Sequence, residues 1–154
     1  MFRTARGEKS RLEADAVLSV LEQGQFGVLA VAGDKGYPYA VPLNFAYADG
    51  KIYIHGSREG HKVDALAADP KVSFCIVTDT TVKPADFTCA FTSVVLFGTA
   101  RKLGGDEKRA AIELLVKKYS ADYWEKAQKV IPAAWDKFAT FEIAIEHMTG
   151  KQTR

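Results

Sequence analysis

Hydrophobic and polar positions alternate along much of the chain, which predicts a protein built mainly from β-strands. Strand-like runs rich in β-branched and aromatic residues lie at 26–31, 37–47, 51–55, 71–77, 88–103 and 138–147. The short turn sequences GDKG and ADGK join the first three runs, which is typical of an antiparallel meander. We therefore expect about six strands, mostly antiparallel because their connections are short.

Other segments have hydrophobic residues at helical spacing and lie before, between or after these strands. The residues expected to cap or end the helices are Ser10 with Glu13 as a capping box, Gly24, Ser57, Asp69 with Pro70, Asp106 and Ser120. No repeat or linker divides the chain, so we expect one domain over residues 1–154, mainly β with peripheral helices (α+β). A small antiparallel sheet of this kind removes its exposed edges by closing into a barrel.

The charges are balanced and dispersed, with 21 basic and 19 acidic residues and a net charge of +2. No basic block indicates binding to nucleic acid or to an anionic membrane. No run approaches the roughly 20 apolar residues that span a bilayer, and the N-terminal MFRTARGEKS lacks the apolar core of a secretory signal. We expect a cytoplasmic protein in which Cys75 and Cys89 are buried free thiols, and a disulfide between them depends on geometry that the sequence leaves open.

Several common catalytic signatures are absent, namely a GxGxxG after a strand, a Walker loop, HExxH, CxxC and GxSxG. Their absence disfavours most nucleotide-binding, zinc-protease and hydrolase classes. The three histidines, His55, His61 and His147, have no neighbouring carboxylate at metal-ligand spacing. We therefore expect no metal site.

The stretch KIYIHGSREGHKVDAL, residues 51–66, combines a strand with an unusually polar end. Its isoleucines alternate with Tyr53 and His55, so one face is aliphatic and the other presents an aromatic ring and an imidazole. Beyond the strand, Ser57 offers a hydroxyl, and His61 and Lys62 bring positive charge to the first turn of a helix, where unpaired N–H groups already favour anions. The stretch fits a phosphate pocket; the alternative is that Ser57 is a simple N-cap and Lys62 a solvated charge.

A second unusual element is Pro42 within VPLNF, residues 41–45, because proline removes a donor from a strand ladder. A strand broken there frees backbone groups, which together with Asn44 could hydrogen-bond a planar heterocycle. The alternative is a kink that only helps to bend a barrel wall.

Five segments in this order resemble the pyridoxamine 5′-phosphate oxidase-related flavoproteins: GVLAVAGDKGYPYAVPLNFAY, DGKIYIHGSREGHKVDAL, DPKVSFCIV, FTSVVLFGTA and IEHMTGK. The resemblance runs from the first helix to Lys151 and is greatest to the branch named for 5-nitroimidazole resistance (Nim) proteins. It implies a six-stranded antiparallel split β-barrel that forms a homodimer and binds FMN in a groove at the subunit interface.

The resemblance also implies which residues contact the cofactor. The VPLNF residues would lie along the flavin ring, the end of the third strand and the following helix would line the ring edge and phosphate, and FTSVV would complete the pocket. The implied cofactor-binding residues are Val41, Pro42, Asn44, His55, Ser57, His61, Lys62, Ser93 and Val94.

Two features of this chain affect how the residue roles of the family apply to it. Family members often have Arg or Glu immediately before the Ser-Val pair, where this chain has Thr92, and His61 is a candidate to supply part of that charge. The closing His147, Gly150 and Lys151 match a characteristic tail near the site, with no role assigned to them.

The resemblance implies an FMN-dependent oxidoreductase that acts on a small planar substrate, such as a nitroaromatic reduced by two electrons at a time. His55 is the candidate catalytic residue, because an imidazole donates or accepts a proton near neutral pH. A role in hydrogen-bonding the cofactor without proton transfer remains equally open.

Two other classes stay open. One is a non-catalytic carrier or sensor that binds flavin or haem, and the other is a barrel that binds single-stranded nucleic acid, which the dispersed charge disfavours. The aromatic residues Tyr123, Trp124 and Trp135 indicate either a homodimer contact or burial within one subunit.

Overall fold

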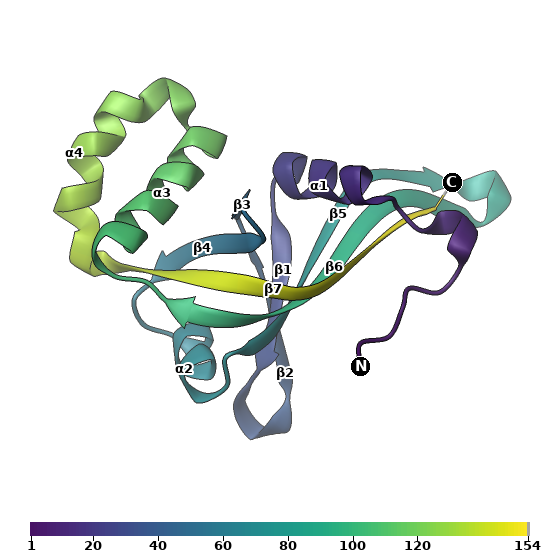
Figure 1. Ribbon diagram of the computed structural model, residues 1–154, viewed down its shortest axis with the longest axis horizontal. Helices are drawn as coiled ribbons and strands as arrows, with labels where there is room; N and C mark the ends of the chain where they lie inside the picture. The colour runs from purple at the N-terminus through teal and green to yellow at the C-terminus, as the bar shows by residue number, and fades with distance from the viewer. Residues whose placement is uncertain (154) are drawn as a thin grey trace.

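The computed structural model describes residues 1–153 and forms one seven-stranded antiparallel sheet within them (Figure 1). The strand order is β2-β1-β5-β6-β7-β4-β3. The strands are β1 Gly27–Ala32, β2 Pro38–Leu43, β3 Ala46–Ala48, β4 Lys51–Ser57, β5 Lys71–Lys83, β6 Thr88–Lys102 and β7 Phe138–Thr153. The α+β class and the split β-barrel predicted from the sequence are confirmed.

Four α-helices lie around this sheet in the described part of the chain: α1 Ala14–Gln23, α2 His61–Ala68, α3 Gly105–Tyr119 and α4 Trp124–Ala134. Helices α3 and α4 form a pair at one end of the sheet, whereas α1 lies over the region of β5 and β6 (Figure 1). None of the helices within residues 1–153 has the length and apolar composition needed to cross a membrane.

The predicted meander is wrong at its second strand, because the run 37–47 forms two strands instead of one. The chain leaves the sheet at Asn44 and Phe45, just after Pro42, whose nitrogen cannot donate to a ladder. As a result β2 pairs only with β1, while β3 and β4 lie at the opposite edge of the sheet. This break accounts for the seventh strand.

Strands β5 and β6 continue as a long hairpin arm beyond the end predicted for the first of them. The polar stretch after Val77 pairs through Thr81–Lys83, with a register shift at Asp79, whose φ is +54°. Strand β7 also runs six residues past His147 and pairs with β6 to Thr153. The arm lacks the alternation of a half-buried strand because both of its faces are largely exposed.

Helix ends are predicted better than helix starts. Gly24 and Asp69 end their helices as expected. The Ser10 hydroxyl instead donates to the Gly7 carbonyl, and α1 begins four residues later, so the capping box is not formed. The caps expected from Ser57 and Asp106 are also wrong, because Gly60 and Gly104 precede α2 and α3.

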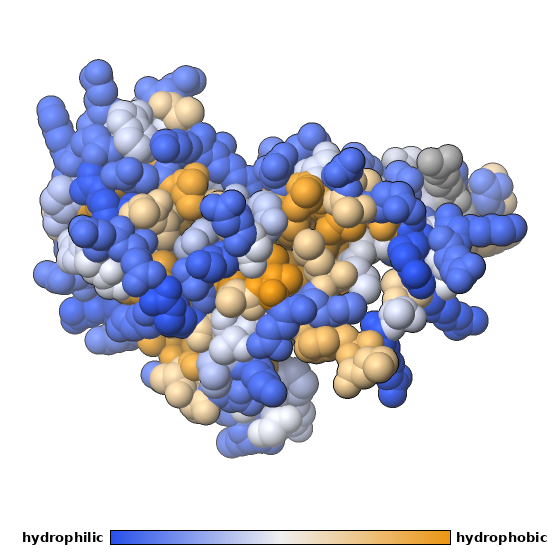
Figure 2. All heavy atoms as spheres, viewed as in Figure 1, coloured by the Kyte–Doolittle hydropathy of each residue, from blue (hydrophilic) through white to orange (hydrophobic). Residues whose placement is uncertain are grey.

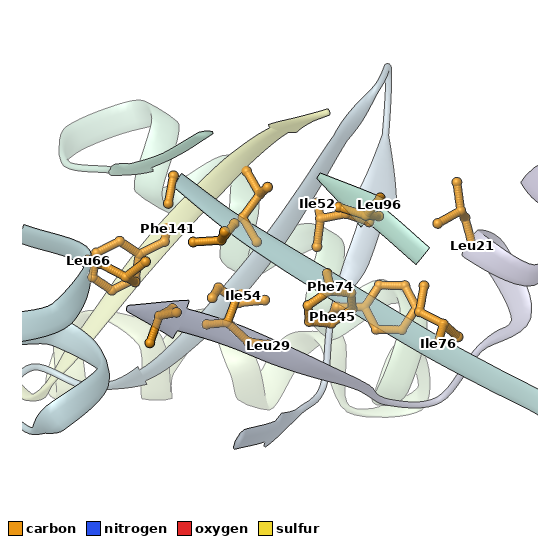
Figure 3. Close-up of a cluster of buried hydrophobic side chains, with 14 of the residues drawn as sticks. Leu21, Leu29, Phe45, Ile52, Ile54, Leu66, Phe74, Ile76, Leu96 and Phe141 are labelled. Carbon is orange, nitrogen blue, oxygen red and sulfur yellow. The ribbon is translucent and has the colours of Figure 1, made fainter. Parts of the chain in front are cut away.

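The core fills the concave side of the sheet (Figure 3). Phe45, Phe74 and the isoleucines of β4 are fully buried, and the two phenylalanine rings meet edge to face with centroids 5.3 Å apart. Gly98 sits at a register shift between β6 and β7, where a Cβ would lie 2.4 Å from the Ala144 carbonyl oxygen. Gly98 therefore lies in a β-bulge, which bends the sheet around the core.

The outer surface is mixed in character. On the face shown in Figure 2, hydrophobic residues gather between the α3–α4 pair and α1, while hydrophilic residues cover the outer sides of the helices. Cys75 and Cys89 are unpaired, and both are half-buried rather than fully buried.

Candidate functional site

The end of β4 presents His55 on the side of the sheet opposite to the core. Ile52 and Ile54 are fully buried in the core, so the alternation places Tyr53 and His55 on the other face, as predicted. His55 is opposite Thr140 in the pairing with β7, and its ring meets Phe138 edge to face with centroids 6.4 Å apart. The imidazole makes no hydrogen bond to any residue in 1–153.

Lys62, in the first turn of α2, extends its side chain back over Gly56 of β4. A Cβ built on Gly56 would lie 2.5 Å from the Lys62 ammonium nitrogen, so only glycine permits this approach. No carboxylate within residues 1–153 forms an ion pair with Lys62. Glycine and lysine therefore form a cradle with an unpaired positive charge, which is a suitable place for a phosphate.

The electrostatics of the cradle favour an incoming anion. Burial lowers the pKa of the Lys62 ammonium, since no protein anion compensates for its lost hydration. Desolvation also lowers the pKa of His55, and the nearby positive charge of Lys62 lowers it further. His55 is thus neutral near pH 7 and is able to donate from one nitrogen and accept at the other.

The other two polar residues of the stretch have different surroundings. The Ser57 hydroxyl is exposed and accepts a hydrogen bond from the Glu59 amide at 3.4 Å. The His61 ring stacks on Tyr39 with centroids 4.1 Å apart and accepts a hydrogen bond from the Asp34 amide. His61 therefore joins α2 to the β1–β2 hairpin instead of facing Lys62.

The strand break beyond Pro42 is filled by Tyr119, the last residue of α3. Its hydroxyl accepts a hydrogen bond from the Phe45 amide at 3.1 Å, and the Gln25 and Phe45 carbonyls lie at 2.6 Å and 2.9 Å as alternative acceptors. The Asn44 side chain donates to the same Gln25 carbonyl at 2.9 Å. The Phe45 backbone groups that the strand break frees are thus hydrogen-bonded to the Tyr119 phenol of a distant helix.

A groove of about 440 Å³ lies beside His55, between α3, α4 and the outer side of β4. Its wall is aliphatic, with Ile112, Leu115 and Ile131 buried in a second hydrophobic cluster. Its lining residues are Asn44, His55, Ile112, Leu115, Val116, Tyr119, Ser120, Ala127, Val130, Ile131, Ala134, Lys137 and Phe138. The structure therefore brings Asn44 and His55 to one groove.

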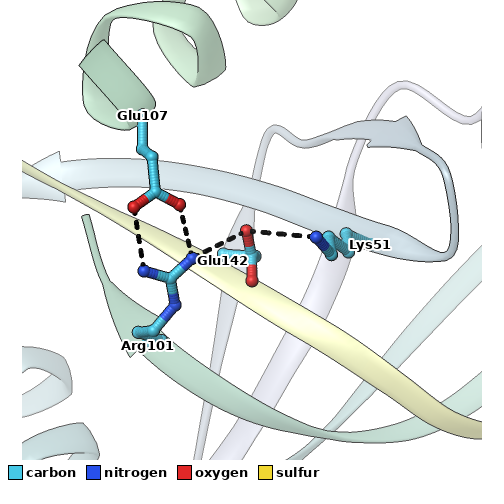
Figure 4. A network of polar contacts seen from close by, with 4 residues as sticks. All are labelled: Lys51, Arg101, Glu107 and Glu142. Atoms are coloured by element: carbon cyan, nitrogen blue, oxygen red, sulfur yellow. Dashed lines mark hydrogen bonds and ion pairs between the residues drawn. The ribbon is translucent and has the colours of Figure 1, made fainter. Parts of the chain in front are cut away.

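Two buried or partly buried polar clusters fix α3 against the sheet next to this groove. Lys108 donates to the Trp135 and Phe138 carbonyls at 2.7 Å and 2.9 Å. One guanidinium nitrogen of Arg101 forms ion pairs with two carboxylates (Figure 4), at 2.6 Å from a Glu107 oxygen and 3.2 Å from a Glu142 oxygen. Lys108 thus ties the start of α3 to the segment before β7 and to β7 itself, and Arg101 ties it to β6 and β7.

Ser93 and Val94 lie far from His55 in the same subunit. Ser93 is paired with Lys151, eleven residues along β7 from the Thr140 that pairs with His55. At about 3.3 Å per residue this separates the two groups by roughly 35 Å along the strand. One chain alone therefore does not bring Ser93 and His55 into one site.

The residues around Ser93 and in β2 have mixed exposure. Val94 is fully buried in the core, and Thr92 is buried and accepts a hydrogen bond from Gln152. Val41 packs against the core from β2, while Pro42 is exposed.

The C-terminal tail follows the same arm. His147 stacks on Phe2 with ring centroids 5.0 Å apart, and Gly150 accepts a hydrogen bond from the Leu12 amide. Within the described residues, no three His, Cys, Asp or Glu side chains come together in a way that would hold a metal ion.

Sequence reasoning missed the residues that shape the groove. Tyr119 and Phe138 are both aromatic residues next to predicted element ends, which is a weak signal by itself. The helical pattern of α3 showed an apolar side but not that it faces His55. The unpaired buried ammonium of Lys118, 3.8 Å from the Phe45 ring centroid, also had no sequence signal.

Comparison with solved structures supports the fold. A protein from Bacteroides thetaiotaomicron named for 5-nitroimidazole antibiotic resistance superposes with a TM-score of 0.75 at 21% identity, covering 92% of this chain and 86% of that chain. A FAD-binding protein from Mesorhizobium loti gives 0.65 at 27% identity, covering 94% and 97%. A FAD- and haem-binding protein from Mycobacterium smegmatis gives 0.79 at 20% identity, covering 96% and 74%.

Among curated proteins, no sequence matches this chain. The family model described as pyridoxamine 5′-phosphate oxidase matches residues 13–152, which span the helix α1, every strand and both sides of the groove. The resemblance noted in the sequence is thereby confirmed, and the chain belongs to the pyridoxamine 5′-phosphate oxidase family.

Proposed function

We propose that this protein binds a flavin, specifically FMN, and acts as an oxidoreductase on a small planar acceptor such as a nitroaromatic. The observation that carries the proposal is the Gly56–Lys62 cradle beside His55, because it combines an unpaired ammonium with a backbone that leaves room for an anion. Solved relatives in the same fold are described as FAD-binding, which supports a flavin.

The cradle favours FMN over FAD as the proposed cofactor. It offers one unpaired ammonium, which suits a terminal phosphate monoester, whereas His61 has protein partners and is not free to add a second charge. Lys62 would hold the phosphate, and His55, Asn44 and Pro42 would contact or border the ring system. A flavin supplies the hydride- and electron-transfer chemistry when it is bound.

We assign His55 the role of exchanging a proton with the substrate. Its lowered pKa keeps the ring neutral, so that one nitrogen is a donor near pH 7. Reduction of a nitro group to a nitroso group takes two electrons and two protons and releases one water. His55 would relay one of these protons, taking up a proton from solvent at one nitrogen while it gives one to the substrate from the other. The aliphatic wall of the groove would limit access of water to the reaction.

We also propose that the functional unit is a homodimer. Ser93 and His55 belong to one site only if the arm of a second copy approaches the β4 end of the first, since they are far apart within one chain. The arm carries exposed hydrophobic residues that suit such a contact, with Val82 70% and Phe87 97% exposed.

The decisive measurement is the visible absorption spectrum of the purified protein, followed by release and chromatography of the chromophore. A flavin spectrum with released FMN is the expected result, released FAD would overturn the choice of FMN, and a Soret band without flavin would favour a haem carrier. A colourless protein that fails to bind added FMN would refute the proposal.

Catalysis is tested separately with His55→Ala. We expect reduction of a nitroaromatic by NAD(P)H to fall at least tenfold while flavin occupancy stays near that of the wild type. An equal loss of both would instead assign His55 to cofactor binding. Size-exclusion chromatography with light scattering tests the dimer, and a monomer that binds flavin fully would contradict the shared site.

A further inference from the structure

The groove beside His55 has the size and walls of a small-molecule site in its own right. Its volume of about 440 Å³ lies within the ~300–1,000 Å³ typical of ligand pockets. The buried side chains of Ile112 and Leu115 line it from α3, and Ala127, Ile131 and Ala134 line it from α4. Such walls favour a flat, mainly apolar ligand.

The groove has few polar groups, and its lining residues carry positive rather than negative charge. No aspartate or glutamate is among its lining residues, which include Lys137, the residue before the Phe138 whose ring meets that of His55. The Asn44 amide and the Tyr119 hydroxyl already donate to the Gln25 carbonyl, which leaves His55, Lys137 and the Ser120 hydroxyl as the lining donors with no protein partner in residues 1–153. A ligand is therefore recognised through one accepting or negatively charged group near His55.

The groove is continuous with the cofactor cradle through a single side chain. His55 lines the groove, and Gly56, the next residue of β4, lies under the Lys62 ammonium of the cradle. Thr140, which pairs with His55, is fully buried and its hydroxyl has no partner within the described residues. A ligand in the groove would thus sit next to the proposed flavin without occupying the phosphate cradle.

We propose that this groove binds the substrate, and that the substrate is an aromatic molecule with one negatively charged or strongly accepting group directed towards His55 and Lys137. This inference rests on the proposed function, since it assigns the groove to the acceptor that reacts there. Binding itself depends only on the residues that line the groove, and can be measured without turnover.

The test uses 8-anilinonaphthalene-1-sulfonate, an aromatic anion that fluoresces in apolar sites, titrated into the folded full-length protein. Ala134→Trp fills the groove from the end of α4, whereas Ala133→Trp adds the same side chain at an exposed neighbouring position outside the lining. We expect Ala134→Trp to weaken probe binding at least tenfold and Ala133→Trp to leave it unchanged. Equal affinity in the two variants would overturn the inference.

A second pair of variants tests the charge preference without disturbing the packing. Val130 lines the groove but is 51% exposed, so a charged side chain is tolerated there. We expect Val130→Glu to weaken binding of the sulfonate several-fold relative to Val130→Lys, with less difference at high salt. No difference between the two would refute the proposed preference for a negatively charged group.

Flavin content, read from the visible spectrum of each variant, separates the two proposals. Wild-type flavin content in Ala134→Trp with loss of the probe supports a groove distinct from the cofactor site. If the probe expels bound flavin, the groove is the cofactor's own site and the inference is wrong. A protein without flavin that shows the expected probe pattern would refute the proposed function and still support the groove as a binding site.

Discussion

Replacing Gly56 with alanine tests whether the cradle of Gly56 and Lys62 holds the cofactor phosphate. The new Cβ would lie 2.5 Å from the Lys62 ammonium nitrogen, and ordinary contact begins at 3.4 Å, so the ammonium must move by the difference. Because the clashing atom is the end of a flexible side chain, the fold tolerates the change. Alanine in a strand is also slightly more favourable than glycine, by roughly 0.5–1 kcal/mol.

The expected effect is on binding rather than on stability. A hydrogen bond to a charged group contributes about 1.5–3 kcal/mol, which corresponds to a loss of roughly 10- to 150-fold in affinity for FMN. The affinity is measured by quenching of flavin fluorescence on titration of apoprotein into FMN. Urea unfolding of the apoprotein measures stability in parallel, and we expect its midpoint to stay at or slightly above the wild-type value.

A double-mutant cycle shows whether Gly56 acts through Lys62. Lys62→Gln alone is expected to cost about as much affinity as Gly56→Ala, and the double variant no more than either, because both remove the same contact. Gly104→Ala is the control, since a Cβ there meets no atom within 4 Å. Wild-type affinity in Gly56→Ala, or losses that add in the double variant, would refute the assignment of the cradle.

Two further predictions concern the stability of the helices around the groove. Burial lowers the pKa of Lys118 from 10.5 to about 8, so its protonated form opposes folding below pH 8 and this penalty disappears as the pH rises to 10.5. Lys118→Met should therefore be more stable than the wild type at pH 7, by roughly 1–2 kcal/mol after allowing for partial exposure. In urea unfolding, this difference in unfolding free energy should shrink as the pH rises to 10.5. A difference that does not change with pH, or the same pH dependence in Lys117→Met, would contradict the prediction. Lys108→Met leaves the Trp135 and Phe138 carbonyls without their buried donor. It should therefore lower the unfolding free energy by about 2–4 kcal/mol. The control Lys126→Met, at an exposed position of α4, should change the unfolding free energy by less than about 0.5 kcal/mol.

Much of the fold was predictable because local patterns record which face of an element is buried. The alternation of Ile52 and Ile54 with Tyr53 and His55 predicted the two faces of β4 correctly. The arm beyond Val77 was missed because a strand exposed on both faces has no alternation to detect. Helix starts were missed where glycine precedes the helix and the expected cap lies elsewhere, as at Gly60.

The candidate site was predictable only in its local part. The sequence alone determined that His55, Gly56 and Lys62 lie within one strand–helix connection, and that Pro42 interrupts a strand. The tertiary structure decided that Tyr119 fills this interruption, that the apolar side of α3 faces His55, and that Ser93 lies far from His55 along β7. The physical reason is that residue spacing fixes the geometry within a turn or a strand, whereas the partner of each face is chosen by long-range pairing and packing, which depend on the whole chain.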